Sequence, residues 1–126
     1  ASFAQTRLFL DERLRFDTHN KPIATYHIPL VYQVTRTSLS IERLRHSLSA
    51  LIHKHKILRT RLFFTNDHAL QQEILDDITP LLVITTISSD DEMARILYDE
   101  ETNPRLFDVS AGHVFRCHIL RSVSSP

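Results

Sequence analysis

Residues 40–64 read SIERLRHSLSALIHKHKILRTRLFF, and they join a helical pattern directly to a strand pattern. A hydroxyl at Ser38 or Ser40 can cap a helix that we predict over 40–55. Apolar side chains in this stretch share one arc of roughly 100° on the helix, and they are Ile41, Leu44, Leu48, Leu51 and Ile52. The following run, 59–64, has the composition of a strand. A helix that passes straight into a strand predicts a mixed α/β fold.

The rest of the chain continues this alternation. Two capping boxes, in which a serine stands three residues before a glutamine or glutamate, open further helices that we predict over 3–14 and about 90–101. They are Ser2 with Gln5 and Ser89 with Glu92. Strands are predicted over 26–35, 70–75, 81–87 and 113–121. Pro29 lacks a backbone N–H, so the first of these strands is expected at an edge or bulge. We expect an α/β domain with a mixed sheet packed against helices.

The composition excludes several common functions. The 126 residues carry 15 basic and 15 acidic side chains, and this balance gives no electrostatic footprint for nucleic acid or a membrane surface. A single glycine, Gly112, rules out dinucleotide and phosphate-binding loops. A single cysteine, Cys117, rules out internal disulfides and cysteine-rich zinc sites. No apolar run approaches the roughly 20 residues of a membrane span, so we expect a cytoplasmic protein with neither nucleic acid nor membrane as a partner.

The eight histidines do not form a metal-binding pattern. His53 and His55 lie two apart on a predicted helix and point in nearly opposite directions. His113 and His118 lie five apart on a predicted strand and therefore occupy opposite faces. We expect no metal site, and we interpret these histidines as surface residues or hydrogen-bonded core residues.

Three side chains remain open to two interpretations each. Arg7 lies within the apolar stripe of the first helix, where it either extends its head to solvent or forms a buried pair with a carboxylate. His55 is in phase with the apolar face of its helix, which favours a hydrogen-bonded core residue over a catalytic one. Arg59 either complements a helix C-terminus or forms a structural ion pair. The acidic groups 90–92 and 99–101 are expected at a helix start and on a solvated face. No nucleophile stands beside a base, so we predict no catalytic residue.

Three stretches, in the right order, resemble core motifs of the condensation domains of nonribosomal peptide synthetases. Residues 2–11, SFAQTRLFLD, resemble the first motif, SxAQxRLWxL. Residues 53–63, HKHKILRTRLF, resemble the second motif, RHExLRTxF. Residues 106–116, LFDVSAGHVFR, are similar to the FDLxxGPLLR stretch that precedes the family's catalytic strand. Together they cover nearly the whole chain.

The sequence also departs from the family pattern. Phe9 stands where a tryptophan and a further apolar residue are usual, while Lys54 and Lys56 replace the arginine and glutamate of the second motif. The third motif, HHxxxDG, is absent. We therefore expect residues 1–126 to be the N-terminal part of a single condensation domain, truncated before that motif. As such a piece, the chain should be inactive, and it should expose the face and edge of the strand at 113–121.

The resemblance implies part of one lobe of a chloramphenicol-acetyltransferase-like fold. It implies amide formation, in which an amine on one carrier protein attacks a thioester on another. Each substrate is held by the phosphopantetheine arm of a peptidyl or acyl carrier protein, and no cofactor binds the domain directly. By motif position, Arg59 would pair with the aspartate of HHxxxDG, using a fork that is always charged. Arg7 would be a structural pair partner and His55 a packing or hydrogen-bonding residue.

Two other functions remain open. An acyltransferase of the same superfamily would use coenzyme A or a carrier-bound donor to esterify an alcohol. A non-catalytic docking or interaction domain would carry a degenerate HHxxxDG motif, and the altered charges at Lys54 and Lys56 agree with it. The partners would otherwise be carrier proteins and the remainder of the condensation domain.

Overall fold

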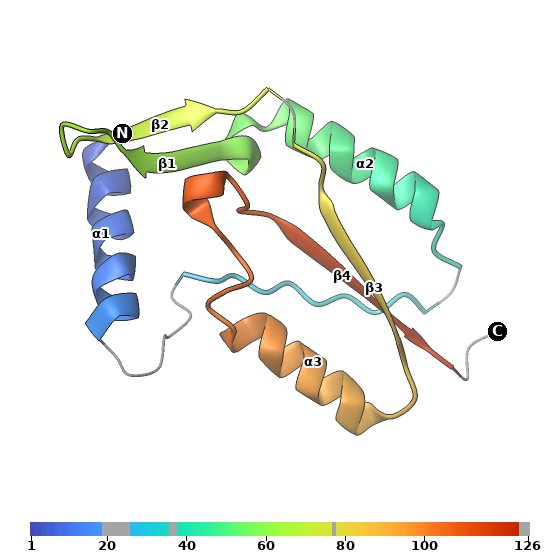
Figure 1. Ribbon diagram of the computed structural model, residues 1–126. Helices are drawn as coiled ribbons and strands as arrows, with labels where there is room; N and C mark the ends of the chain where they lie inside the picture. The colour runs from blue at the N-terminus through green and yellow to red at the C-terminus, as the bar shows by residue number, and fades with distance from the viewer. Residues whose placement is uncertain (19–25, 36–37, 77, 124–126) are drawn as a thin grey trace.

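A computed structural model describes residues 1–18, 26–35, 38–76 and 78–123. Helices and strands alternate along these segments (Figure 1). In chain order the elements are α1 (Phe3–Thr18), α2 (Ile41–Lys54), η1 (Lys56–Arg59), β1 (Thr60–Phe64), β2 (Leu70–Ile74), β3 (Leu81–Ile87), α3 (Asp90–Thr102), η2 (Val109–Ala111) and β4 (Arg116–Ser122). The predicted α/β class is therefore confirmed.

The strands pair as two two-stranded sheets within the described residues. β1 and β2 form an antiparallel hairpin that pairs Thr60 with Ile74 and Phe64 with Leu70. β3 and β4 are parallel and pair Leu81 with Arg116 at one end. Parallel neighbours need a long crossover, and α3 with the segment that follows it supplies that crossover. We expected one mixed sheet; in the described residues the two strand directions instead occur in separate sheets, one antiparallel and one parallel.

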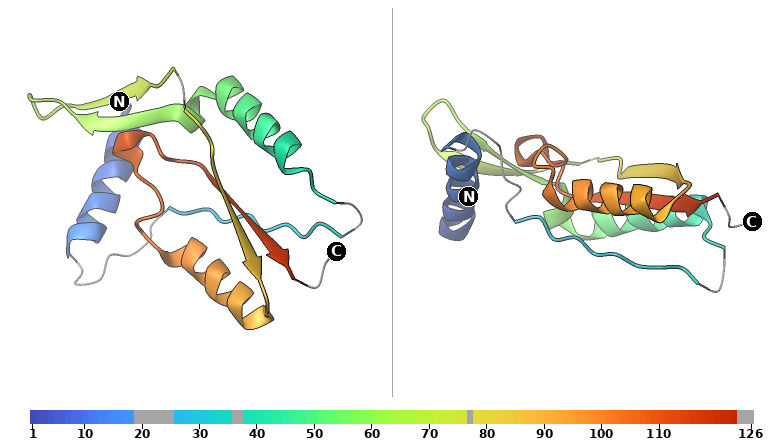
Figure 2. Two further views of the ribbon diagram at one scale, coloured as in Figure 1. Left: turned by 45° about the vertical axis from the view of Figure 1, so that its right-hand side comes forward. Right: turned by 90° about the horizontal axis from the view of Figure 1, so that it is seen from below.

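The elements surround the β3–β4 pair. α2 and α3 lie on opposite sides of these two strands, and the β1–β2 hairpin crosses one end (Figures 1 and 2). α1 packs against the hairpin, where the rings of Phe9 and Phe64 meet edge to face at 5.6 Å. Its N-terminus has the predicted capping box, because Gln5 N–H donates to the Ser2 hydroxyl and the Ser2 N–H donates to the Gln5 amide.

The apolar core is small. Its buried hydrophobic side chains are Leu48 and Ile52 of α2, Leu70 of β2 and Ile87 of β3. The predicted cap of α2 is present, since the Arg43 N–H donates to the Ser40 hydroxyl.

The apolar stripe predicted for α1 remains mostly exposed, and Phe3 is 87% exposed. The helix was predicted correctly, but in the described structure few elements cover its stripe.

The strand predicted over 26–35 is wrong for this structure. Residues 27–35 are free of regular secondary structure, and no described strand pairs with them. A lone segment has no neighbour to accept its ladder hydrogen bonds, so its alternating pattern does not produce a strand. Its apolar side chains are exposed, with Ile28 at 84% and Tyr32 at 82%. We expected the exposed face at 113–121 instead, where residues 116–120 of β4 are half-buried.

Two element ends also differ from prediction. α1 continues to Thr18, so Asp17 and Thr18 are helical, and the rest of the loop predicted after them lies outside the described residues. β4 begins at Arg116 instead of 113, because the preceding residues form a compact turn. In that turn the Asp108 carboxylate accepts from the backbone N–H groups of η2, and Gly112 ends it with a left-handed φ of 81°.

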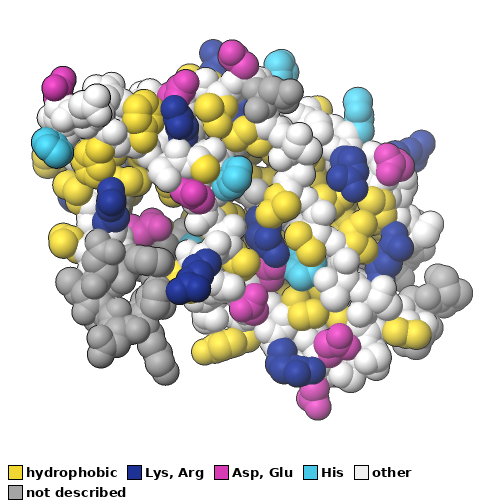
Figure 3. Space-filling view, viewed as in Figure 1, with side chains coloured by type: hydrophobic (Ala, Val, Ile, Leu, Met, Phe, Trp, Pro, Cys, Tyr) yellow, Lys and Arg dark blue, Asp and Glu magenta, His cyan; other side chains and the backbone are white. Residues whose placement is uncertain are grey.

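The surface carries both signs of charge close together. On the face seen in Figure 3, basic and acidic side chains alternate among apolar ones. In the described part of the chain, none of the helices combines the length and apolar character that crossing a membrane requires.

Candidate functional site

Arg59, the residue that the second motif singled out, is buried at the end of η1 with 8% of its surface exposed. Its Nη1 donates to the Leu75 carbonyl at 2.5 Å, and its Nη2 donates to the His53 carbonyl at 3.4 Å. Its Nε is buried and has no hydrogen-bond partner. No carboxylate of the described residues pairs with the guanidinium. A buried guanidinium is normally paired with an anion, because desolvation of an unpaired charge is costly.

The surroundings of Arg59 fix its position. The Leu75 N–H donates to the Arg59 carbonyl at 2.9 Å, so these two residues are joined through main chain and side chain. The Thr60 hydroxyl donates to the Lys56 carbonyl at 2.8 Å and ties β1 to the preceding turn. Gly112 lies next to Leu75, since a Cβ added to it would lie 2.7 Å from the Leu75 Cδ1. Arg59 is therefore held between α2 and the end of the β1–β2 hairpin, and the turn around η2 packs against Leu75.

The other two predicted site residues lie apart from this cluster. Arg7 is exposed on α1, and its guanidinium makes no hydrogen bond or ion pair within the described segments. The buried pair considered for Arg7 is therefore not formed here. His55 is also exposed, because α2 ends at Lys54 and His55 forms the cap between α2 and η1. The expected place of His55 on the apolar face of the helix is thus wrong. Its hydrogen bonds are made by its backbone, with Leu51 and Leu58.

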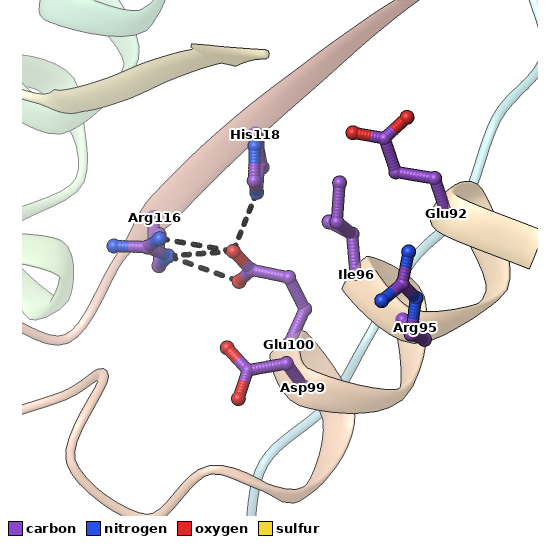
Figure 4. Close-up of a pocket in the computed structure, with 7 residues that line it drawn as sticks. All are labelled: Glu92, Arg95, Ile96, Asp99, Glu100, Arg116 and His118. Atoms are coloured by element: carbon purple, nitrogen blue, oxygen red, sulfur yellow. Dashed lines mark hydrogen bonds and ion pairs between the residues drawn. The ribbon is translucent and has the colours of Figure 1, made fainter. Parts of the chain in front are cut away.

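A second polar cluster joins α3 to the β3–β4 pair (Figure 4). Arg116 of β4 directs its guanidinium onto both oxygens of Glu100, with Nε to Oε2 at 2.9 Å and Nη2 to Oε1 at 2.9 Å. The His118 Nδ1 lies 2.6 Å from the Glu100 Oε1. The side chains are 15% exposed for Arg116, 14% for His118 and 21% for Glu100. Arg116 and His118 are alternate residues of one strand, so their side chains reach the same face.

The cluster continues to β3 through the imidazole. The His118 Nε2 lies 2.7 Å from the Thr85 hydroxyl. An ionised carboxylate only accepts hydrogen bonds, so Nδ1 donates to Glu100, while the hydroxyl can act as donor or acceptor toward Nε2. Partial burial acts to raise the pKa of the Glu100 carboxyl. The hydrogen bonds from Arg116 and His118 outweigh it and hold that pKa below its ordinary value.

A hydroxyl, an imidazole and a carboxylate in sequence are the parts of a nucleophilic triad, but the setting here favours a structural role. Thr85 lies inside a paired strand, where the backbone N–H groups are used in the ladder, whereas an oxyanion needs N–H groups that converge on it. The Glu100 carboxylate is already neutralised by Arg116. Among the described residues, no group of histidine, cysteine or acidic side chains could hold a metal ion.

The sequence carried a signal for Glu100 that we did not use. The acidic group 99–101 was assigned to a solvated face, and this is wrong for Glu100, which is half-buried. Glu100 follows Met93 by seven residues and Ile96 by four, so it continues the half-buried apolar side of α3. An acidic side chain in that phase needs a cationic partner. Its partners on β4 were not identifiable from spacing alone.

The chain is similar in sequence to parts of two peptide synthetases. No protein-family model matches it. It is 32% identical over 124 residues to phosphinothricin tripeptide synthetase PhsC of Streptomyces viridochromogenes, and 33% identical over 122 residues to nonribosomal peptide synthetase kk1B of Curvularia clavata. Each comparison covers 95% of this chain, which spans 11% and 1% of the two relatives.

The fold is similar to that of a solved condensation domain. The condensation domain from Monacolin K polyketide synthase MokA superposes with a TM-score of 0.57 at 18% identity, over 68% of this chain and 20% of that one. The resemblance to nonribosomal peptide synthetase condensation domains, inferred from the three motifs, is thereby confirmed, as is the chloramphenicol-acetyltransferase-like α/β fold class.

Proposed function

We propose that residues 1–126 form the N-terminal part of a condensation domain, and that the complete domain joins carrier-bound acyl and aminoacyl groups through an amide bond. In this reaction the amine nitrogen attacks the thioester carbon, the C–N bond forms, and the C–S bond breaks to release the carrier thiol. The amine loses a proton to a base, and the departing sulfur takes up a proton to become the carrier thiol. This chain supplies scaffold and no catalytic residue, so we expect it to be inactive alone.

The observation that carries the proposal is the buried guanidinium of Arg59 without a described carboxylate partner. The second-motif resemblance assigns this arginine to the aspartate of HHxxxDG, a motif that the sequence does not contain. A guanidinium with a free Nε is suited to receive such a carboxylate, because its planar fork binds carboxylates through two hydrogen bonds. We propose that Arg59 orients the catalytic loop through this pair.

The arrangement of the strands supports a larger domain. Within the described residues β4 pairs with β3 alone. The extended segment 27–35 runs past one face of the β3–β4 pair (Figures 1 and 2). Its exposed apolar side chains, such as Ile28 and Tyr32, are suited to packing against further chain. We propose carrier proteins with phosphopantetheine arms as the partners of the complete domain, and the cytoplasm as its location.

The proposal is tested by amide formation between two loaded carrier proteins, with a radiolabelled aminoacyl group and the complete protein. Arg59→Ala should lower the condensation rate by about tenfold or more, since losing one charge-assisted pair costs roughly 1.5–3 kcal/mol. Arg59→Lys should retain only part of the rate because it keeps the charge and loses the fork. Arg45→Ala, at an exposed position on α2, is the matched control and should behave as wild type.

Three outcomes would contradict the proposal. Equal rates for wild type and Arg59→Ala would remove Arg59 from its role. Esterification of an alcohol from coenzyme A, without amide formation, would identify the related acyltransferase. A complete protein inactive in both assays would favour a docking domain. Lys54 and Lys56, which suggested that alternative, are exposed, and the altered charges therefore leave the Arg59 environment intact.

A further inference from the structure

α3 is held to the sheet by little apolar burial. None of its residues is buried. Its half-buried apolar side chains are Met93, Ile96 and Leu97. By contrast, α2 buries both Leu48 and Ile52. Because hydrophobic stabilisation grows with the apolar area removed from water, the polar contacts of α3 contribute an unusually large share of its attachment.

Those polar contacts are concentrated at one end of the helix. Glu100, in the last turns of α3, is bound by Arg116 and by His118, which in turn contacts Thr85 of β3. At the other end, the Glu92 carboxylate accepts from the N–H and hydroxyl of Ser88. These hydrogen bonds cap the N-terminus of α3 and do not connect the helix to β4. The attachment to β4 therefore depends on the Glu100 end.

We propose that Glu100 is a latch: its carboxylate holds the C-terminal half of α3 closed on β4, and α3 opens from that end about its Ser88–Glu92 cap. Opening would separate Ile96 and Glu100 from the strand and widen the groove in which these residues lie (Figure 4). Local opening of this kind is a property of elements with few buried contacts. It is independent of the amide-forming reaction proposed above.

The latch depends on pH through its carboxylate. The titratable groups around Glu100 are Arg116 and His118 from β4 and Glu92, Arg95 and Asp99 from α3, while β3 contributes the Thr85 hydroxyl. Since hydrogen bonds from Arg116 and His118 hold the pKa of Glu100 below its ordinary value, the latch is at full strength above the usual glutamate range near 4.3. It weakens as pH falls through the lower folded-state pKa.

Peptide-resolved hydrogen exchange on the complete protein tests the latch. In Glu100→Gln, amides of the C-terminal half of α3 should exchange about tenfold or more faster, since hydrogen bonds to charged groups contribute roughly 1.5–3 kcal/mol. Amides of α2 should exchange at the wild-type rate. Glu101→Gln is the matched control, because Glu101 is the exposed neighbour on the same helix and should leave α3 unchanged.

Two results with these variants would overturn the latch. One is the same α3 exchange rate in Glu100→Gln and Glu101→Gln. The other is a rate increase in Glu100→Gln that is shared equally by α2, which would mean global unfolding. A measurement on the wild-type protein needs no variant: after correction for intrinsic rates, lowering the pH from 7 to below about 4 should open the C-terminal half of α3 before α2. Simultaneous opening of both helices would also refute the latch.

Discussion

Arg59 and Arg116 are both largely buried, but their surroundings differ. Arg116 directs two nitrogens onto the two oxygens of Glu100, and this carboxylate also accepts from His118. Arg59 has two carbonyl oxygens as partners, one of them at 3.4 Å, and its Nε has none. Arg116 therefore belongs to a charge pair that is complete in this chain. Arg59 holds a charge whose counter-ion is missing from the described residues.

The difference separates a buried charge that has its partner within the described residues from one that has none there. A complete pair stabilises the structure that is present, and removing one partner leaves the other charge buried and unpaired. A buried charge without a partner lowers the stability of the fold through its desolvation, and an opposite charge that pairs with it offsets that loss. We therefore expect substitutions of Arg116 to lower the free energy of unfolding. Substitutions of Arg59 should mainly lower the condensation rate proposed for the complete domain.

The largest expected effect on stability is at Arg116. Arg116→Met should lower the free energy of unfolding of the complete protein by about 2–3 kcal/mol, because it removes the guanidinium that is paired with the partly buried Glu100 carboxylate. This is less than the 3–5 kcal/mol typical of a fully buried pair, since both side chains are partly exposed. Denaturant titration measures it. A change smaller than that of Arg45→Ala would show that Glu100 needs no partner.

A smaller effect is expected at Gly112, next to the Arg59 environment. Gly112→Ala places a side chain at a φ of 81° and a Cβ 2.7 Å from the Leu75 Cδ1, so Leu75 must move. The left-handed conformation alone costs about 1–2 kcal/mol, and we expect a total loss near 2 kcal/mol in unfolding free energy. Because the Leu75 carbonyl accepts from Arg59, the condensation rate should also fall. Wild-type stability would contradict the packing described here.

The smallest effect is expected at Thr85. Thr85→Val keeps the shape of the side chain and removes the hydroxyl that contacts the His118 Nε2. Leaving that nitrogen without a partner should cost about 1 kcal/mol in denaturant titration. Thr85→Ser restores the hydroxyl and should recover most of the loss. If valine and serine behave alike, the hydroxyl does not support the imidazole.

The elements of the fold were largely predictable because their signals are local. Ser40 and Ser89 cap the helices that they were expected to cap, and the hairpin forms where turn residues separate two strand-like runs. The segment 27–35 has an equally clear alternating pattern and forms no strand. A strand requires a neighbour that accepts its hydrogen bonds, and the sequence of the segment contains no information about that neighbour.

The candidate site was predictable only where a motif named the residue. Arg59 was identified through its resemblance to the second motif, and its burial agrees with the role still proposed for it. The Glu100, Arg116 and His118 cluster joins residues 16 and 18 positions apart. Periodicity indicates which face a side chain occupies, but it does not indicate which strand will lie opposite. His55 was misplaced for a related reason, because α2 ended one residue before it.

The proposed role of Arg59 is to pair with a carboxylate from the rest of a condensation domain. The most direct measurement is a crystal structure of the complete protein, with the distance from the Arg59 guanidinium nitrogens to the nearest carboxylate oxygen. We predict a charge-assisted hydrogen bond of about 2.7–2.9 Å to an acidic side chain outside residues 1–126. A guanidinium that still contacts only the carbonyls of Leu75 and His53 would contradict the claim.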